Sequence, residues 1–363
     1  ANALAETAAT NGTSLGAEVF GAFMSSPTEA IIFGLIFVAL TMLIVMGGVS
    51  GGIEKVCSVG MPALFVMLLI CIIRACTLEG AVDGLKYMFV PGWAVANGVI
   101  DKEPNFFGVL SAAGGQMFFS LSLGMGIMIT YGSYLDKKEN LQKNALLIII
   151  MDTLVALMAG LCVIPGRFEL DPTGSLGGPK LLFVTMQNVF SRMGPIGPIF
   201  GILFYLLVVF AAISSSISLL EAVVAHFVDN ARDAGKGDKR KAYALIAAAA
   251  VGVGAVLICA DSLGDASFTP WRLLNLPAES IRTWNDCWLD FFDMLSEGIM
   301  MPLGALMMTL MVGWELGPDV VKDECEASGH AMASYGFYKV CIKYITPLCM
   351  ILVLYGQIKE FFF

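Results

Sequence analysis

Apolar residues occur along the chain in long runs, which shorter polar segments separate. About 20 helical residues, rising about 1.5 Å each, cross the roughly 30 Å hydrocarbon layer of a bilayer. Each long run with few charges is therefore a candidate span. Eight such runs lie at residues 29–49, 58–77, 107–134, 144–165, 194–227, 241–261, 289–315 and 335–358. The pattern predicts an all-α polytopic membrane protein with about eight transmembrane helices.

The third of these spans carries residues that weaken a helix. Its segment 115–130 reads GQMFFSLSLGMGIMIT and places Ser120, Ser122, Gly124 and Gly126 near the centre. Glycine lowers helix propensity, and an unpaired backbone group is costly in lipid. We therefore predict a discontinuous helix over 107–134 with a binding site at the break. The alternative is a kinked but continuous helix that only packs against its neighbours.

Composition supports the membrane class and argues against several functions. The 363 residues are 57% hydrophobic and 14% charged, whereas soluble domains are about 45–50% apolar and about 25% charged. A net charge of −9 argues against a nucleic-acid partner, which needs clustered Lys and Arg. The nine cysteines lie mostly in apolar runs without a CxxC pair, which favours packed thiols. We expect no enzyme, because the sequence shows no nucleophile and base at a suggestive spacing.

Loop charge predicts the orientation of the chain. Four loops that carry Lys or Arg should face the cytoplasm by the positive-inside rule: residues 50–57, 136–143, 230–241 and 316–334. The other loops and the segment 1–28 should face outward. We expect the protein to lie in the cytoplasmic (inner) membrane. Within the outward loop 165–194, residues 183–193 are too apolar for a solvated connection. This loop is predicted to fold back as an outer plug.

Four acidic residues fall inside predicted spans: Asp152, Glu221, Asp293 and Glu297. A central Asp costs roughly 2.5–3.5 kcal/mol on insertion, so a functional role is the first hypothesis for each. Asp152 suits an ion or proton role, with a structural partnership as the alternative. Asp293 begins a span, where the helix dipole alone would favour an acid. Glu221 and Glu297 show no partner in the sequence, and we expect them to face a cavity or a partner outside the chain.

A second polar group lies in the segment 210–221, FAAISSSISLLE. Ala211, Ser214 and Ser215 share one helical face at spacings i, i+3 and i+4. Hydroxyl and carbonyl oxygens are the hard ligands that a sodium ion needs inside a membrane. The alternative is that these serines bond to their own helix or allow close helix packing.

These motifs resemble the prokaryotic branch of the neurotransmitter:sodium symporter family, which has the leucine-transporter fold. The segments that carry the resemblance are VSGGIEKVCSVGMPALF at 49–65, GQMFFSLSLGMGIMITYGSYL at 115–135, LLFVTMQNVF at 181–190, FAAISSSISLLE at 210–221, LDFFDMLSEGIMMPLG at 289–304 and KYITP at 343–347. The eight spans resemble helices 4 to 11 of two inverted repeats. The resemblance thus implies that residues 1–363 form one transporter domain whose first three helices are missing, so that this polypeptide alone would not transport.

The resemblance also implies roles for individual residues. It implies a substrate site of Phe119, Ser120, Ser122, Met125, Ser215 and Leu219. It implies two sodium ions, bound by Ser120, Asp152, Ala211, Ser214 and Ser215. It implies an outer gate at Asp293.

Chloride should not be needed, on the same resemblance. Asp152 stands where many members have Asn, and Ala156, one turn on, can neither bind nor replace a chloride ion. Asp152 would then carry the negative charge itself.

The function that follows is sodium-coupled symport of a neutral, hydrophobic or aromatic amino acid by alternating access across the membrane. One alternative is a proton-coupled transporter of the same fold, with Asp152 as the proton carrier. Another is a non-transporting membrane fragment. A channel is less favoured, because the polar residues gather at two helix centres instead of lining several helices.

Overall fold

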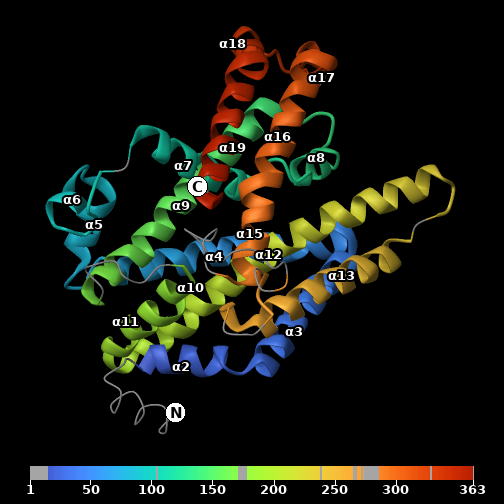
Figure 1. Cartoon of the computed structure of the whole chain (residues 1–363). Coiled ribbons are helices and arrows are strands. Elements are labelled where there is room, and N and C mark those ends of the chain that lie inside the picture. The colour runs from blue at the N-terminus through green and yellow to red at the C-terminus, as the bar shows by residue number, and fades with distance from the viewer. Residues whose placement is uncertain are drawn as a thin grey trace. The chain divides into compact units, whose positions relative to one another are not determined.

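A computed structural model describes residues 15–103, 105–170, 178–237, 239–264, 268–270, 273, 286–327 and 329–362. The regular elements in these residues are helices (Figure 1). In the first half of the chain they are α2 (Leu15–Met24), α3 (Pro27–Met46), η1 (Val49–Ile53), α4 (Glu54–Ala75), α5 (Ala81–Phe89), α6 (Trp93–Ala96), α7 (Phe106–Ser120), α8 (Ile127–Gly132), α9 (Leu141–Leu170), α10 (Gly178–Lys180), η2 (Leu181–Thr185), α11 (Met186–Arg192) and η3 (Gly194–Ile196). In the second half they are α12 (Gly197–Asp233), α13 (Arg240–Asp261), η4 (Ser262–Gly264), α15 (Trp288–Asp293), η6 (Met294–Met300), α16 (Met301–Leu310), η7 (Met311–Glu315), α17 (Asp319–Ala327), α18 (Tyr335–Val340), η8 (Cys341–Ile345) and α19 (Thr346–Phe362).

Seven helical segments of the described residues are long and apolar enough to cross a membrane. They are Pro27–Met46, Gly51–Ala75, Leu141–Phe168, Gly194–Asp233, Arg240–Gly264, Trp288–Glu315 and Tyr335–Lys359. Each matches one of the eight predicted spans, with ends that differ by a few residues. The remaining predicted span, 107–134, is divided between α7 and α8. The prediction of an all-α polytopic membrane protein is confirmed.

The chain forms two compact units. The first unit consists of residues 1–103 and 153–217, and the second consists of residues 104–152 and 218–363. The long helices α9 and α12 contribute residues to both units.

The core of the first unit brings α4, α9, α11 and α12 together. Its buried side chains are Leu68, Cys71, Met158, Cys162, Met186, Val189, Phe190, Met193 and Phe204. Phe190 is 4% exposed, and its ring lies 5.4 Å from that of Phe204 and 6.3 Å from that of Tyr205, centroid to centroid. The apolar character of the segment around Phe190 therefore reflects burial against three helices.

The segment predicted as an outer plug is more helical than the sequence suggested. The helix α9 continues to Leu170, so the connection begins later than residue 165. Residues 171–177 lie outside the described part, and the rest forms α10, η2 and α11. The helix α2 lies beside η2 and α11 (Figure 1). The segment 1–28, which was predicted to face outward, is thus helical over Leu15–Met24. The role of outer plug stays a prediction.

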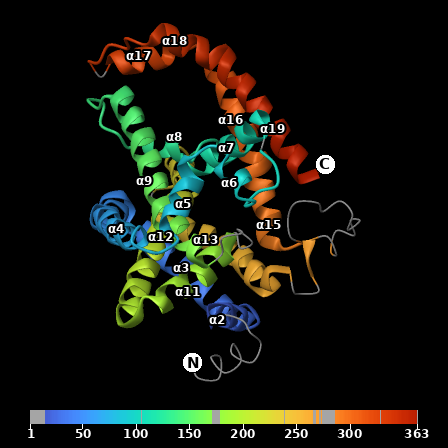
Figure 2. The same ribbon diagram turned by 90° about the vertical axis from the view of Figure 1, so that its left-hand side faces the viewer.

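The core of the second unit joins α7, α16 and α19, which Figures 1 and 2 show side by side. Its buried residues are Phe118, Met301, Ala305, Met350 and Val353. Glycines let α7 approach α19 closely: a Cβ atom on Gly115 would lie 2.4 Å from Nε2 of Gln357. The amide of Gln357 in turn donates to the carbonyl oxygen of Ser111, at 3.3 Å. This packing fixes the half of the broken helix that precedes the break.

We predict that Phe190→Ala lowers the stability of the first unit. Removing a buried Phe side chain costs about 3–5 kcal/mol through lost burial and the cavity that remains. The control is Ile199→Ala, because Ile199 is 67% exposed on α12 and such substitutions change stability by about 0.5 kcal/mol or less. Thermal unfolding of the protein in detergent measures both, and equal melting temperatures for the two variants would contradict the packing described here.

Candidate functional site

The helix of residues 107–134 is broken at its centre. Its first half, α7, ends at Ser120, and its second half, α8, begins at Ile127. Between them, Ser122, Gly124 and Gly126 have φ angles of 54°, 76° and 79°. These left-handed angles are open to glycine, but they cost a residue with a side chain roughly 1–2 kcal/mol. The prediction of a discontinuous helix is confirmed, and the continuous kinked alternative is wrong.

Backbone contact with α16 holds the break in place. A Cβ atom on Gly124 would lie 2.3 Å from the carbonyl oxygen of Met301, and one on Gly304 would lie 2.7 Å from the carbonyl oxygen of Gly124. Both positions therefore require glycine. The backbone N–H of Leu123 donates to the carbonyl of Phe118, at 2.9 Å, which satisfies part of the opened backbone. Phe118 itself is fully buried and anchors the end of α7.

A hydroxyl and a carboxylate meet at the end of α7. Ser120 Oγ donates to Oδ1 of Asp152 on α9, with 2.6 Å between the two oxygens. The two residues are 32 positions apart in the sequence. The last carbonyl groups of α7 also point toward the break, and the C-terminal end of a helix favours a cation. Hard oxygen ligands and a negative charge are thus gathered at one place, as a small monovalent cation requires.

The predicted oxygen group on α12 is present on one helical turn. Ser214 Oγ donates to the carbonyl oxygen of Ala211, at 2.9 Å, and Ser215 follows on the exposed side. The packing alternative predicts a serine that bonds to its own helix, as observed. The cation-site hypothesis predicts carbonyl and hydroxyl oxygens that lie close together, and the same contact meets this requirement. The structure thus leaves both interpretations of this group in place.

A neighbouring polar contact was missed from the sequence. Ser216 Oγ lies 2.8 Å from Oγ1 of Thr41 on α3, which is 4% exposed. The two residues are 175 positions apart. A lone Thr in an apolar span was the available signal, but it did not identify the partner.

The remaining predicted site residues lie on α7, α12 and α15 and in the break between α7 and α8. Phe119, at the end of α7, is 52% exposed, and Leu219, on α12, is 47% exposed. Met125, in the break, packs against the core of the second unit. Asp293 ends α15, and Glu297 follows one turn later in η6. The expectation for Glu297 stays a prediction.

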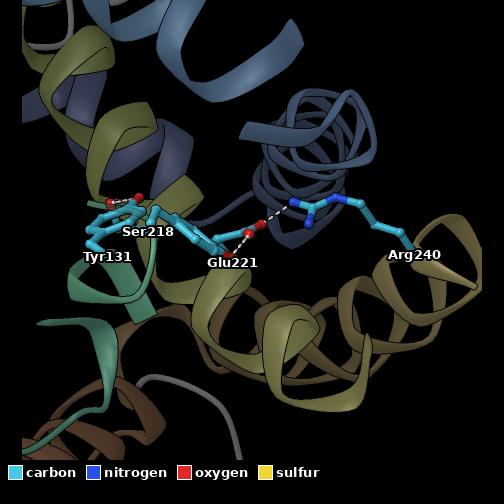
Figure 3. Close-up of polar contacts among 5 residues, drawn as sticks. Tyr131, Ser218, Glu221 and Arg240 are labelled. Carbon is cyan, nitrogen blue, oxygen red and sulfur yellow. Dashed lines mark hydrogen bonds and ion pairs between the residues drawn. The ribbon is translucent and has the colours of Figure 1, made fainter. Parts of the chain in front are cut away.

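Glu221 has partners within the chain, contrary to our expectation. It is fully buried on α12, where the guanidinium of Arg240 pairs with Oε2 and the hydroxyl of Tyr134 donates to Oε1, at 2.6 Å (Figure 3). The hydroxyls of Tyr131 and Ser218 form a second bond, at 2.7 Å. The pairing was missed because Arg240 was counted with the basic loop, whereas it is the first residue of α13.

Two contacts therefore tie the second half of the broken helix to α12. Tyr131 belongs to α8, and Tyr134 follows its end. Both hydroxyls bond to residues of α12 that are one turn apart, Ser218 and Glu221. The carboxylate of Glu221 is stable in a buried position because two donors satisfy its oxygens.

Apolar spanning helices, one of them broken at its centre beside buried polar groups, define the class of secondary transporters with discontinuous helices. The model of the sodium:neurotransmitter symporter family matches residues 26–269. The chain belongs to this family, as the sequence motifs predicted.

Individual relatives agree with this assignment. The uncharacterized sodium-dependent transporter YhdH of Bacillus subtilis is 31% identical over 92% of this chain and 68% of its own length. An uncharacterized sodium-dependent transporter of Haemophilus influenzae is 30% identical, over 91% of this chain and 65% of its own length. The crystal structure of MhsT in complex with L-phenylalanine superposes with a TM-score of 0.75 at 29% identity, covering 94% of this chain and 71% of that one. These proteins are transporters, which confirms the expectation that the chain is not an enzyme.

Replacing Gly124 should disturb the break more than replacing Gly126. The two residues have nearly the same φ, so Ala costs about 1–2 kcal/mol at either position. Gly126 has open space for a Cβ atom, whereas Gly124→Ala adds a backbone clash that costs about 1–3 kcal/mol more. Thermal unfolding of the two variants in detergent measures the difference, and a Gly126→Ala variant as unstable as Gly124→Ala would contradict the contact with α16.

Breaking the Glu221–Arg240 pair should be more costly than removing both charges. Arg240→Gln leaves a buried carboxylate without its ion partner, which costs about 3–5 kcal/mol. In the double variant Glu221→Gln/Arg240→Gln, no charge remains buried, so its loss should be smaller than the sum of the single losses. A double-mutant cycle of unfolding free energies measures this coupling. Additive losses would show that the two side chains act independently.

Proposed function

We propose that the protein couples the entry of sodium ions to the uptake of a neutral, hydrophobic or aromatic amino acid by alternating access. The observation that carries this proposal is the hydrogen bond between Ser120 and Asp152 beside the break between α7 and α8. Membership of the sodium:neurotransmitter symporter family supports it. The chain spans 68% of the length of the Bacillus subtilis relative and 65% of the length of the Haemophilus influenzae relative.

Two sodium sites are proposed. One uses Ser120 and Asp152, where the carboxylate balances the charge of the ion. The other uses the carbonyl oxygen of Ala211 and the hydroxyls of Ser214 and Ser215. The names of the relatives, which describe sodium-dependent transporters, favour sodium over a proton as the coupling ion.

The proposed substrate site lies at the break. The side chains of Phe119, Met125 and Leu219 would line its apolar part, and the hydroxyls of Ser120, Ser122 and Ser215 would contact the polar part of the substrate. Apolar walls with a few polar groups suit a neutral amino acid with a hydrophobic or aromatic side chain. MhsT, crystallised with L-phenylalanine, and insect relatives named sodium-dependent nutrient amino acid transporter support this class of substrate.

The membrane supplies the driving force in this proposal. Each positive charge that enters down the membrane potential contributes about 2.3 kcal/mol per 100 mV, in addition to the sodium gradient. The protein would lie in the cytoplasmic membrane, with the loops 50–57, 136–143, 230–241 and 316–334 on the cytoplasmic side. The segment 165–194 would cover the outer side as a plug, and Asp293 would be part of an outer gate.

Uptake into proteoliposomes tests the coupling ion. Vesicles that contain a full-length version of the protein should accumulate radiolabelled L-phenylalanine when an inward sodium gradient is applied, whereas residues 1–363 alone are predicted not to transport. The uptake by the full-length version should cease when choline replaces sodium. Uptake driven by an inward proton gradient without sodium would replace the proposal with the proton-coupled alternative, and the absence of uptake under every gradient would favour a non-transporting fragment.

We predict that transport does not need chloride and depends on the charge of Asp152. Replacing chloride by gluconate should leave the initial rate unchanged, because the carboxylate already supplies the negative charge. Asp152→Asn should lower the rate by about tenfold or more, since a loss of about 1.4 kcal/mol in ion binding is already tenfold. The control is Asp136→Asn, in an exposed turn after α8, which should transport normally. Loss of uptake in gluconate would disprove chloride independence.

A further inference from the structure

We propose that Thr41 is a positioning residue for the second of the two proposed sodium sites, an inference that rests on the proposed function. Thr41 lies on α3 and Ser216 lies on α12, with 2.8 Å between their hydroxyl oxygens. Both residues belong to the first unit. The same unit contains the proposed sodium ligands Ala211, Ser214 and Ser215. The hydroxyl contact therefore ties α3 to the part of α12 that carries these ligands.

Thr41 lies in a helix that is otherwise apolar at this depth. Between Ala30 and Met46, it is the one residue with a polar side chain. Thr41 is 4% exposed and Val45, one turn later, is fully buried, whereas Leu43 between them is 61% exposed. The helix α3 thus buries a narrow stripe of side chains, and Thr41 is part of it. A buried hydroxyl is costly unless it is hydrogen-bonded, so its bonds decide what Thr41 contributes.

Two arrangements of protons satisfy both hydroxyl groups. In one, Thr41 donates to Ser216, and Ser216 donates to the carbonyl oxygen of Ile213, at 3.0 Å. In the other, Ser216 donates to Thr41, and Thr41 donates to the carbonyl oxygen of Phe37, also at 3.0 Å. Each hydroxyl has a single proton, so both arrangements need both side-chain oxygens. A valine at position 41 could support neither of them.

The contact defines the rotation of α12 about its axis. Successive residues of an α-helix point about 100° apart, so Ser216 points about 100° from Ser215 and about 160° from Ser214. The side chains of Ile213 and Ile217, which lie near Ser216 on the helix, are buried. Apolar packing is non-directional, whereas a hydrogen bond requires a defined distance and angle. The bond from Thr41 therefore directs Ser214 and Ser215 away from α3.

Loss of this bond should weaken sodium binding in particular. Residues that orient the ligands of a metal ion change its affinity without touching the ion. A small rotation of α12 would move the oxygens of Ala211, Ser214 and Ser215 together. If Thr41 only stabilised the fold, its loss would lower the amount of folded protein and leave the affinity for sodium unchanged. The affinity therefore distinguishes positioning from general stabilisation.

The experiment uses a full-length version of the protein in liposomes and measures binding of radiolabelled sodium and sodium-driven uptake of L-phenylalanine. Thr41→Val keeps the shape of the side chain and removes the hydroxyl. It should raise the sodium concentration for half-saturation by about threefold to tenfold in both measurements, as expected for a lost hydrogen bond between membrane helices. The maximal uptake rate at saturating sodium should change by less than about twofold. Thr41→Ser, which retains a hydroxyl, should restore the wild-type half-saturation.

A control and a double variant make the test specific. The matched control is Thr309→Val on α16: Thr309 is 9% exposed, and its hydroxyl donates to the carbonyl oxygen of Leu306 on its own helix, at 2.8 Å. This control should bind sodium as the wild type does. Because one bond links Thr41 and Ser216, the double variant Thr41→Val/Ser216→Ala should bind sodium about as weakly as either single variant.

Three results would overturn the positioning role. They are an unchanged half-saturation in Thr41→Val, an equal loss in Thr309→Val or Thr41→Ser, and losses that add in the double variant. If the wild type binds sodium but shows no uptake, the proposed coupling fails, while the binding measurements still decide the role of Thr41. If the wild type neither binds sodium nor shows uptake, the proposed function fails and the positioning role fails with it.

Discussion

The structure depends on one constraint, which is that lipid offers no hydrogen bonds to an opened backbone. A helix that breaks in the middle of a membrane must satisfy its backbone groups and hold its shape through protein contacts. Here the turn after α7 bonds back to the carbonyl of Phe118, and Gly124 lies directly against the backbone of α16. The break is therefore a packed feature of the second unit. It also presents the end of α7 and the hydroxyl of Ser120 beside the carboxylate of Asp152.

The same constraint explains how the buried polar residues are arranged. Glu221 is fully buried, and both of its carboxylate oxygens receive a donor, one from Arg240 and one from Tyr134. Removing one partner would leave a buried charge without a compensating charge in apolar surroundings. The two members of such a pair therefore contribute to stability jointly. The bond from Tyr134 also holds the end of the second half-helix against α12. The same contacts therefore pair the buried charge of Glu221 and hold the second half of the broken helix in position.

The amino-acid sequence by itself determined the membrane class, the spans and the position of the break. Hydropathy over about 20 residues reports the length of a helix in lipid, and Gly124 and Gly126 lower helix propensity locally, so both features are encoded in neighbouring residues. The tertiary structure alone decided which distant side chains meet. It paired Glu221 with Arg240 and Thr41 with Ser216, and it placed Gly124 against α16. Such pairs depend on how the helices pack, and the hydrophobic pattern of a single helix in lipid does not specify which of its neighbours it will face.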